Sequence, residues 1–155
     1  MIRIGEKALP FRIPAIIDQE LVYLDPDRFN GKWVALCFVS RLGLSEATVL
    51  DHQGKALEEA GAVLLVTPTG TKSLQTLELT YLDGVSFTTI ADPLGRLQRL
   101  YGGPIILPPS RCQTFFIDPD GFFRLYVAHS ANDWSKGVLA EVLRAYQGRE
   151  VAVQA

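Results

Sequence analysis

Two cysteines and two histidines are the most versatile nucleophiles, bases and metal ligands in this 155-residue chain. Cys37 lies inside an almost continuously apolar run, Trp33–Val39, and Cys112 stands near the start of a later apolar segment. Their separation is not the CxxC spacing of a redox or metal pair. Because a cysteine within an apolar run is typically a small buried hydrophobe, we expect Cys37 to be buried.

The other nucleophiles and ligands lack the partners that chemistry would need. We expect His52 on a helix and His129 in a loop, both as solvated surface residues with no carboxylate or cysteine at ligand spacing, so the sequence predicts no metal and no cofactor. A serine nucleophile requires a positioned base. Ser45 is therefore interpreted as a helix N-cap.

Composition favours one globular domain over residues 1–155. Fifteen basic and 17 acidic residues give a net charge of −2, which argues against nucleic acid as a partner. The N-terminus shows no signal-peptide pattern, and no apolar run is long enough to cross a membrane. We therefore expect a cytoplasmic protein.

The order of elements predicts an α/β fold. Apolar runs at 11–17 and 21–24 indicate an N-terminal hairpin, Trp33–Val39 a central strand, and a helix follows from Ser45 to Gly61. Further strands are expected at 62–68, 85–92, 113–117 and 123–128, the last pair joined by the Asp118–Gly121 turn. Further helices are expected around Leu74–Tyr81, at 93–103, and from near Asp133 to Gly148. Trp134, near the start of the last of these helices, is expected to be a packing residue. Right-handed crossovers make the early strands parallel, so the sheet is mixed and flanked by helices.

Four segments in this order resemble the peroxiredoxins, a branch of the thioredoxin fold that includes the alkyl hydroperoxide reductases and thiol-specific antioxidants. They are "IGEKALPF", "DPDRFNGKWVALCFV", "FTTIADPLGRLQRLYGG" and "TFFIDPDG". The resemblance covers most of the chain. It implies a thioredoxin-like fold, and the possibility of a homodimer.

The catalytic motif of that family is missing from the segment that should carry it. The family pattern is Pro, three residues, Thr or Ser, two residues, Cys, and aligned without gaps from Phe38 it falls on Ser40, Leu44 and Ala47. Shifting by one residue places Ser45 at the hydroxyl position and still supplies no thiol. Peroxide reduction requires a thiolate. The resemblance therefore implies a degenerate pocket.

The family's second catalytic group, an arginine before the late hairpin, falls on Cys112. Arg111 precedes it by one residue, so a strand would turn it to the opposite side unless a small bulge restored it. Cys112 is the better single thiol candidate. We expect it to be a free, buried cysteine, and the alternative is a partly exposed, acidic thiol beside the pocket. The topology makes the Cys37 and Cys112 strands antiparallel neighbours, which allows a contact between the two sulfurs.

These observations predict a peroxiredoxin-like protein that has lost peroxidase activity and binds a protein partner or a small molecule. The alternative is a divergent thiol oxidoreductase that uses Cys112, with or without Cys37. Leu42 and Leu44 bring apolar side chains to the degenerate pocket, which favours infilling or an apolar ligand.

Overall fold

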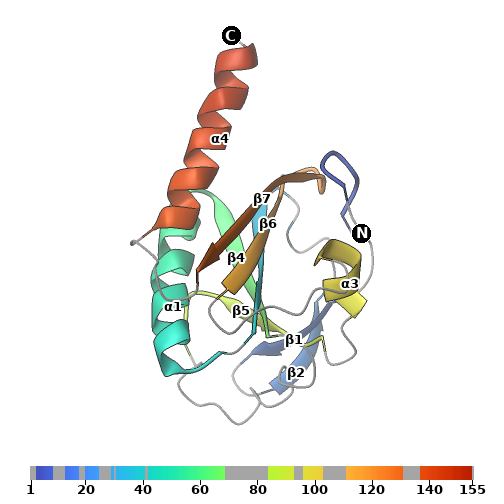
Figure 1. Cartoon of the computed structure of the whole chain (residues 1–155), viewed down its shortest axis with the longest axis vertical. Helices are drawn as coiled ribbons and strands as arrows, with labels where there is room; N and C mark the ends of the chain where they lie inside the picture. Colours follow the sequence, from blue (N-terminus) through green and yellow to red (C-terminus); the bar gives the residue numbers. More distant parts are fainter. Residues whose placement is uncertain are drawn as a thin grey trace.

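A computed structural model describes residues 3–8, 13–17, 20–24, 29, 31–40, 42–68, 84–92, 96–102, 111–130 and 137–154. Figure 1 shows a sheet with helices on both sides. The strands are β1 (Ile13–Ile17), β2 (Glu20–Leu24), β3 (Trp33–Val39), β4 (Ala62–Pro68), β5 (Thr88–Ile90), β6 (Arg111–Ile117) and β7 (Phe123–Ser130). The helices are α1 (Leu44–Glu59), α3 (Arg96–Gly102) and α4 (Val138–Gln154).

The strands form one mixed sheet in the order β2-β1-β5-β4-β3-β6-β7. β3, β4 and β5 run parallel, whereas β1–β2, β3–β6 and β6–β7 are antiparallel. All seven residues of β3 are buried, because the strand has neighbours on both edges and helices over both faces. The expected mixed sheet and N-terminal hairpin are confirmed.

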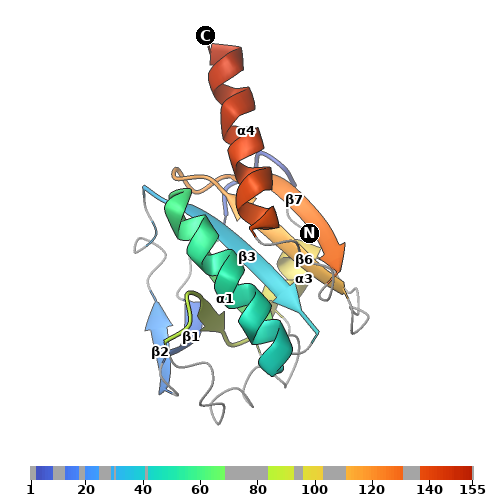
Figure 2. The same ribbon diagram turned by 90° about the vertical axis from the view of Figure 1, so that its left-hand side faces the viewer.

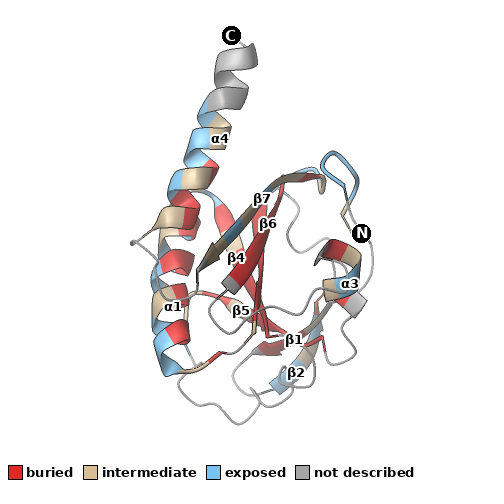
Figure 3. Cartoon of the chain, in the orientation of Figure 1, coloured by how far each residue is buried: buried red, intermediate tan, exposed pale blue. Residues whose placement is uncertain are grey.

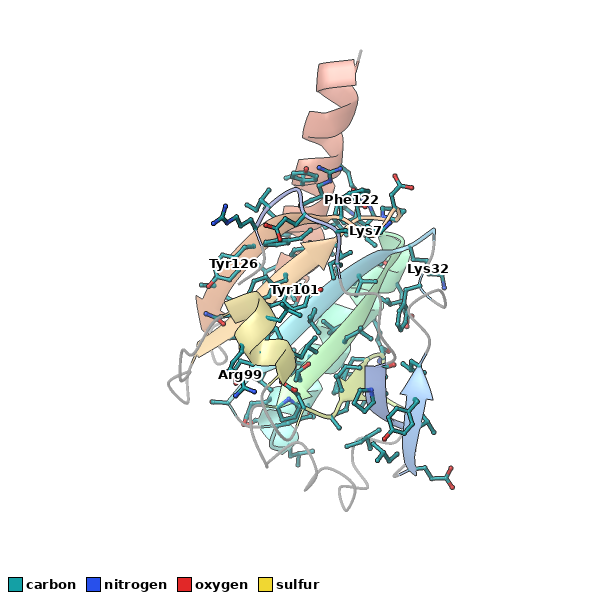
Figure 4. All side chains as sticks on the ribbon, turned by 90° about the vertical axis from the view of Figure 1, so that its right-hand side faces the viewer. Lys7, Lys32, Arg99, Tyr101, Phe122 and Tyr126 are labelled. Carbon is teal, nitrogen blue, oxygen red and sulfur yellow. The ribbon has the colours of Figure 1, made fainter. Side chains whose placement is uncertain are left out.

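Helices divide the core between the two faces of the sheet. α1 and α4 cover one face, called here the α1/α4 face, and α3 covers the other (Figures 2 and 4). Alternation along β3 sends Ala35, Cys37 and Val39 to the α1/α4 face, and Phe38 to the α3 face, where its ring lies 6.3 Å from that of Tyr101. Figure 3 shows the buried residues concentrated in the central strands and on the helix sides that face them.

Several element boundaries differ from the sequence expectation. α1 begins at Leu44 with Gly43 as its N-cap, so Ser45 lies inside the first turn. β5 is shorter than 85–92. α4 runs from Val138 through Gly148 to Gln154, because Gly148 has no positive φ and the residues after it continue the helix.

Some sequence predictions fall outside the described residues. These are the helix expected around Leu74–Tyr81, the start of the last helix near Asp133, and Trp134. Among the residues that are described, no helix is long and apolar enough to span a membrane.

Candidate functional site

The first turn of α1 is the place where the resemblance puts the family's nucleophile. Ala47 lies in this turn, is buried, and donates its backbone N–H to Gly43 O at 2.9 Å. The chain has no cysteine between Ser40 and Glu59. The helix N-terminus therefore has its partial positive charge but no sulfur beside it.

A carboxylate occupies this helix end instead. Glu46 is 8% exposed, its Oε1 accepts the Gly43 backbone N–H at 3.3 Å, and its Oε2 accepts the Ser45 hydroxyl. A glutamate at the third helical position that binds the N-cap N–H satisfies one of the unpaired donors of the helix end. The negatively charged group at the N-terminus of α1 thus belongs to the protein itself.

The remaining residues of the degenerate motif separate into buried and exposed groups. Leu42 is buried in the same apolar cluster as Ala47 and Cys112, which agrees with infilling. Leu44 is 64% exposed, so its side chain does not fill the degenerate pocket. Ser40 is half-buried at the end of β3, and its Oγ is buried with no hydrogen-bond partner.

Both cysteines are buried thiols on the α1/α4 face. Cys37 is 0% and Cys112 is 1% exposed, so Cys112 is the free, buried cysteine that we expected and not the partly exposed alternative. β3 and β6 are antiparallel neighbours, as predicted, with Cys37 opposite Thr114 and Cys112 opposite Val39. The two sulfurs therefore come from diagonal positions on one face of the sheet.

The diagonal register disfavours a disulfide. Diagonal cross-strand neighbours have Cα atoms about 7–8 Å apart, whereas disulfides usually span about 4.4–6.8 Å. Both cysteines are free in the structure. A Cys37–Cys112 bond would thus require movement of the backbone.

His129 is not the solvated loop residue that the sequence suggested. It lies in β7, directly opposite Cys112, and is half-buried, with its Nε2 2.8 Å from Thr114 Oγ1. β7 continues past Ala128 because β6 provides pairing partners as far as Arg111. The alternating pattern of "FRLYVAHS" was the signal that could have placed His129 in the strand.

The Cys37 sulfur carries the clearest electrostatic signature among the described residues. The hydrogen bond with Cys112 lowers the pKa of Cys37 most, burial raises it, and His129 and Thr114 lower it further, so that the pKa falls from 9.0 to about 6. A thiol that only fills space in an apolar core would show the opposite shift. Cys37 is therefore buried as expected but is not electrostatically inert.

The position of Arg111 follows from the strand backbone. Arg111 begins β6 opposite Ser130, and Cys112 follows in regular register opposite His129. The single irregularity between β6 and β7 lies at Phe116/Ile117, far from this end. The small bulge that would have moved Arg111 into the position of Cys112 is absent.

Solved structures similar to this one are peroxiredoxins. Enterococcus faecalis AhpC matches with a TM-score of 0.72 and 18% identity over 99% of this chain and 96% of that chain. The reduced 2-Cys peroxiredoxin of Plasmodium vivax matches with a TM-score of 0.72 and 21% identity over 95% and 98% of the two chains. This chain has the peroxiredoxin fold. Mycobacterium tuberculosis AhpC agrees, with a TM-score of 0.67 and 16% identity over 97% and 94% of the chains.

The peroxiredoxin fold is what these comparisons establish. No protein-family model and no curated protein matches the sequence. At these identities the roles of individual residues do not carry over from the similar structures, so the chemistry must be argued from this chain's own side chains. Within the described part of the chain, no cluster of three or more His, Cys, Asp or Glu side chains could hold a metal ion.

Proposed function

We propose that this chain is a peroxiredoxin-fold protein without peroxidase activity that serves in the cytoplasm as a binding or interaction domain for a protein partner or a small molecule. One observation carries the proposal: the first turn of α1 holds Ala47 and the carboxylate of Glu46, and no thiol. A methyl group cannot attack a peroxide oxygen. A resident carboxylate already binds the helix-end donor that could otherwise stabilise a thiolate.

A peroxidase assay tests the loss of activity. Purified protein is incubated with hydrogen peroxide or cumene hydroperoxide and a thiol reductant, and peroxide consumption is followed against a no-protein blank. We expect consumption at background. Turnover that exceeds the blank, scales with protein concentration and disappears in Cys37→Ser or Cys112→Ser would overturn the proposal and favour the second function below.

Restoring a thiol provides a sharper test of the role of Glu46. Ala47→Cys introduces a thiol in the first turn of α1, one residue after Glu46, whose negative charge raises the pKa of a nearby thiol. We expect that thiol to react slowly with iodoacetamide at neutral pH, and the double variant Glu46→Gln/Ala47→Cys to react severalfold faster, as followed by mass spectrometry of the labelled peptide. Glu46→Gln alone is the control for folding. Equal labelling rates in the two cysteine variants would show that Glu46 does not govern this position.

The second candidate is a thiol oxidoreductase built on Cys112 and Cys37, and it is favoured by the lowered pKa of Cys37. Its reaction class would be thiol–disulfide exchange: a thiolate attacks one sulfur of a low-molecular-weight disulfide, a mixed disulfide forms, and the other sulfur leaves as a thiolate. Burial of both sulfurs places this function second, since the disulfide must reach them. Reduction of 2,2′-dithiodipyridine by native protein, measured against Cys37→Ser and Cys112→Ser, tests it.

A homodimer is part of the first proposal. β2 and β7 are the two edges of the sheet, and an edge strand has backbone donors and acceptors that another strand can pair with. Tyr126 on β7 and Tyr23 on β2 are both exposed. Sedimentation velocity at several protein concentrations tests this, and a monomer at every concentration would reject the dimer.

A further inference from the structure

Two hydroxyl groups are buried at the carboxyl ends of β3 and β4. Thr67 lies in β4 and is 0% exposed, and Ser40 directly follows β3 and is half-buried. Thr67 Oγ1 and Ser40 Oγ are both buried, and neither has a hydrogen-bond partner in the part of the chain that the structure describes. Buried hydroxyls in native proteins are hydrogen-bonded as a rule, because an unpaired one costs its full desolvation. The two atoms therefore point to a partner other than the described side chains.

Both hydroxyls belong to the face of the sheet that α3 covers (Figure 4). Along β4, Val66 packs in the α1/α4 core and Leu65 in the core beneath α3, so alternation turns Thr67 towards α3. Thr67 is the parallel register partner of Phe38, which also packs beneath α3. Ser40 comes two residues after Phe38, and continued alternation puts its side chain on the same face. The two hydroxyls thus lie on neighbouring strands and on one face.

The geometry of the sheet sets the distance that an occupant must bridge. Neighbouring strands lie about 4.8 Å apart and a strand rises about 3.3 Å per residue, so the Cα atoms of Ser40 and Thr67 are about 8 Å apart. A group that hydrogen-bonds both hydroxyl oxygens at about 2.8 Å links atoms up to about 5.6 Å apart. The two side chains cover the difference between these lengths. One small group therefore reaches both hydroxyls.

The surroundings favour an uncharged occupant. The core beneath α3 is built from apolar side chains, among them Phe38, Ile90 and Tyr101. Asp92, the buried carboxylate that precedes α3, accepts backbone N–H groups of that helix with both of its oxygens. A charge without a counter-charge is costly in such surroundings, whereas a neutral group that both donates and accepts satisfies two hydroxyls. Because Thr67 is completely buried, the bridging group must also be small.

We propose that Ser40 Oγ and Thr67 Oγ1 are the protein ligands of one internal polar site, in which a neutral hydrogen-bonding group bridges the ends of β3 and β4. The site lies at the end of the strands where open α/β sheets bind their ligands. Water supplies this chemistry, and so does the hydroxyl or amide end of a small neutral solute. The site does not depend on either function proposed above. A solute in it would give the small-molecule role of the first proposal a place in the fold.

Thr67→Val tests whether the hydroxyl has a partner, because valine keeps the shape of threonine and lacks its hydroxyl. If the hydroxyl binds an occupant, the variant loses that hydrogen bond, and the midpoint of thermal unfolding should fall by about 2–4 °C. This is the expected result. If the hydroxyl had no partner, the variant would lose only a buried unpaired group, and the midpoint would rise. A raised midpoint would overturn the site.

Ser40→Ala and the double variant Ser40→Ala/Thr67→Val test whether the two hydroxyls share one occupant. Urea unfolding of the wild type and the three variants gives the change in unfolding free energy for each, after circular dichroism has shown that the variants fold. With a shared occupant, the double variant should be less destabilised than the sum of the two single changes. Additive losses would overturn the shared site, because each hydroxyl would then have a separate partner.

A high-resolution crystal structure of the wild type tests the site without any substitution. Electron density within hydrogen-bond distance of both hydroxyls is expected, and its absence would overturn the proposal. Acetamide then identifies the source of the bridging group. A thermal midpoint that rises with acetamide concentration in the wild type and not in Thr67→Val indicates that a neutral solute occupies the site. Equal responses of the two proteins identify the bridging group as water.

Discussion

Individual residues show where this chain departs from the catalytic motif of the family that its sequence resembles. At the first turn of α1 a carboxylate, Glu46, binds the helix-end N–H, and the neighbouring side chain is the methyl group of Ala47. The two thiols of the chain, Cys37 and Cys112, lie instead on the face of the sheet that α1 covers. The structure thus combines a helix end with no thiol and a buried sulfur with a lowered pKa.

The pH dependence of stability should show the state of Cys37. Its pKa is about 6 in the folded protein, below about 8.5 for an unfolded cysteine. Because the folded value is the lower one, the contribution is fully present above the unfolded pKa and is lost as pH falls through about 6. The free energy of unfolding of wild type minus that of Cys37→Ser should therefore rise between about pH 6 and about 8.5. Urea unfolding at several pH values measures this difference, and a flat difference would contradict the lowered pKa.

At the scale of elements, α1 is fixed in position by one buried hydrogen bond to α4 and by one close approach to the backbone of Ser86. Gln53 is fully buried and its Oε1 accepts the backbone N–H of Leu139 at 3.1 Å, which ties α1 to the first turn of α4. The next residue, Gly54, lies so close to Ser86 that an added Cβ would be 2.1 Å from the Ser86 carbonyl oxygen. The position of α1 over the sheet therefore depends on a glycine in the middle of the helix.

Replacing glycine should have opposite effects in the two long helices. Gly54→Ala forces α1 away from the Ser86 backbone, and overpacking of this kind costs about 1–3 kcal/mol. Gly148→Ala, the matched control in α4, meets no atom within 4 Å and should stabilise the protein by about 1 kcal/mol or less through helix propensity. Thermal and urea unfolding of both variants measures the effects. A stabilised Gly54→Ala variant would show that α1 does not approach the Ser86 backbone as described.

The whole molecule is organised around strands with partners on both edges. β3 lies between β4 and β6 near the middle of the sheet, whereas β2 is an edge strand with one partner. The three strands that bring together the cysteines and His129 are β3, β6 and β7, so the sulfur cluster spans the centre and one edge of the sheet. Because the central strands are buried and are paired on both edges, we expect the centre of the sheet to be the last region to open.

Hydrogen exchange should follow this arrangement. Peptides from β3 should exchange most slowly, because every residue is buried and both neighbouring strands are present, and peptides from β2 should exchange much faster through local opening. Hydrogen–deuterium exchange followed by mass spectrometry measures the order. Protection of β2 equal to that of β3 would indicate that the edge is covered, as in a dimer formed through β2.

The sequence by itself determined the fold class, the order of the described elements, the burial of Cys37 and the absence of a cysteine from the start of α1. These depend on local periodicity and on residue types, which the chain carries directly. It misplaced the start of α1 and the end of α4, since Gly43 and Gly148 are ambiguous signals until the surrounding contacts are known.

Only the tertiary structure decided which side chains lie beside the two thiols. The burial of Cys112, the meeting of its sulfur with Cys37, and the position of His129 beside Thr114 follow from the pairing register of β3, β6 and β7. Register is a property of strands far apart in the sequence, and a shift of one residue would turn each of these side chains to the other face. The position of the Glu46 carboxylate at the N-terminus of α1 likewise depends on where the helix begins, because a start at Leu44 makes Glu46 the third helical residue.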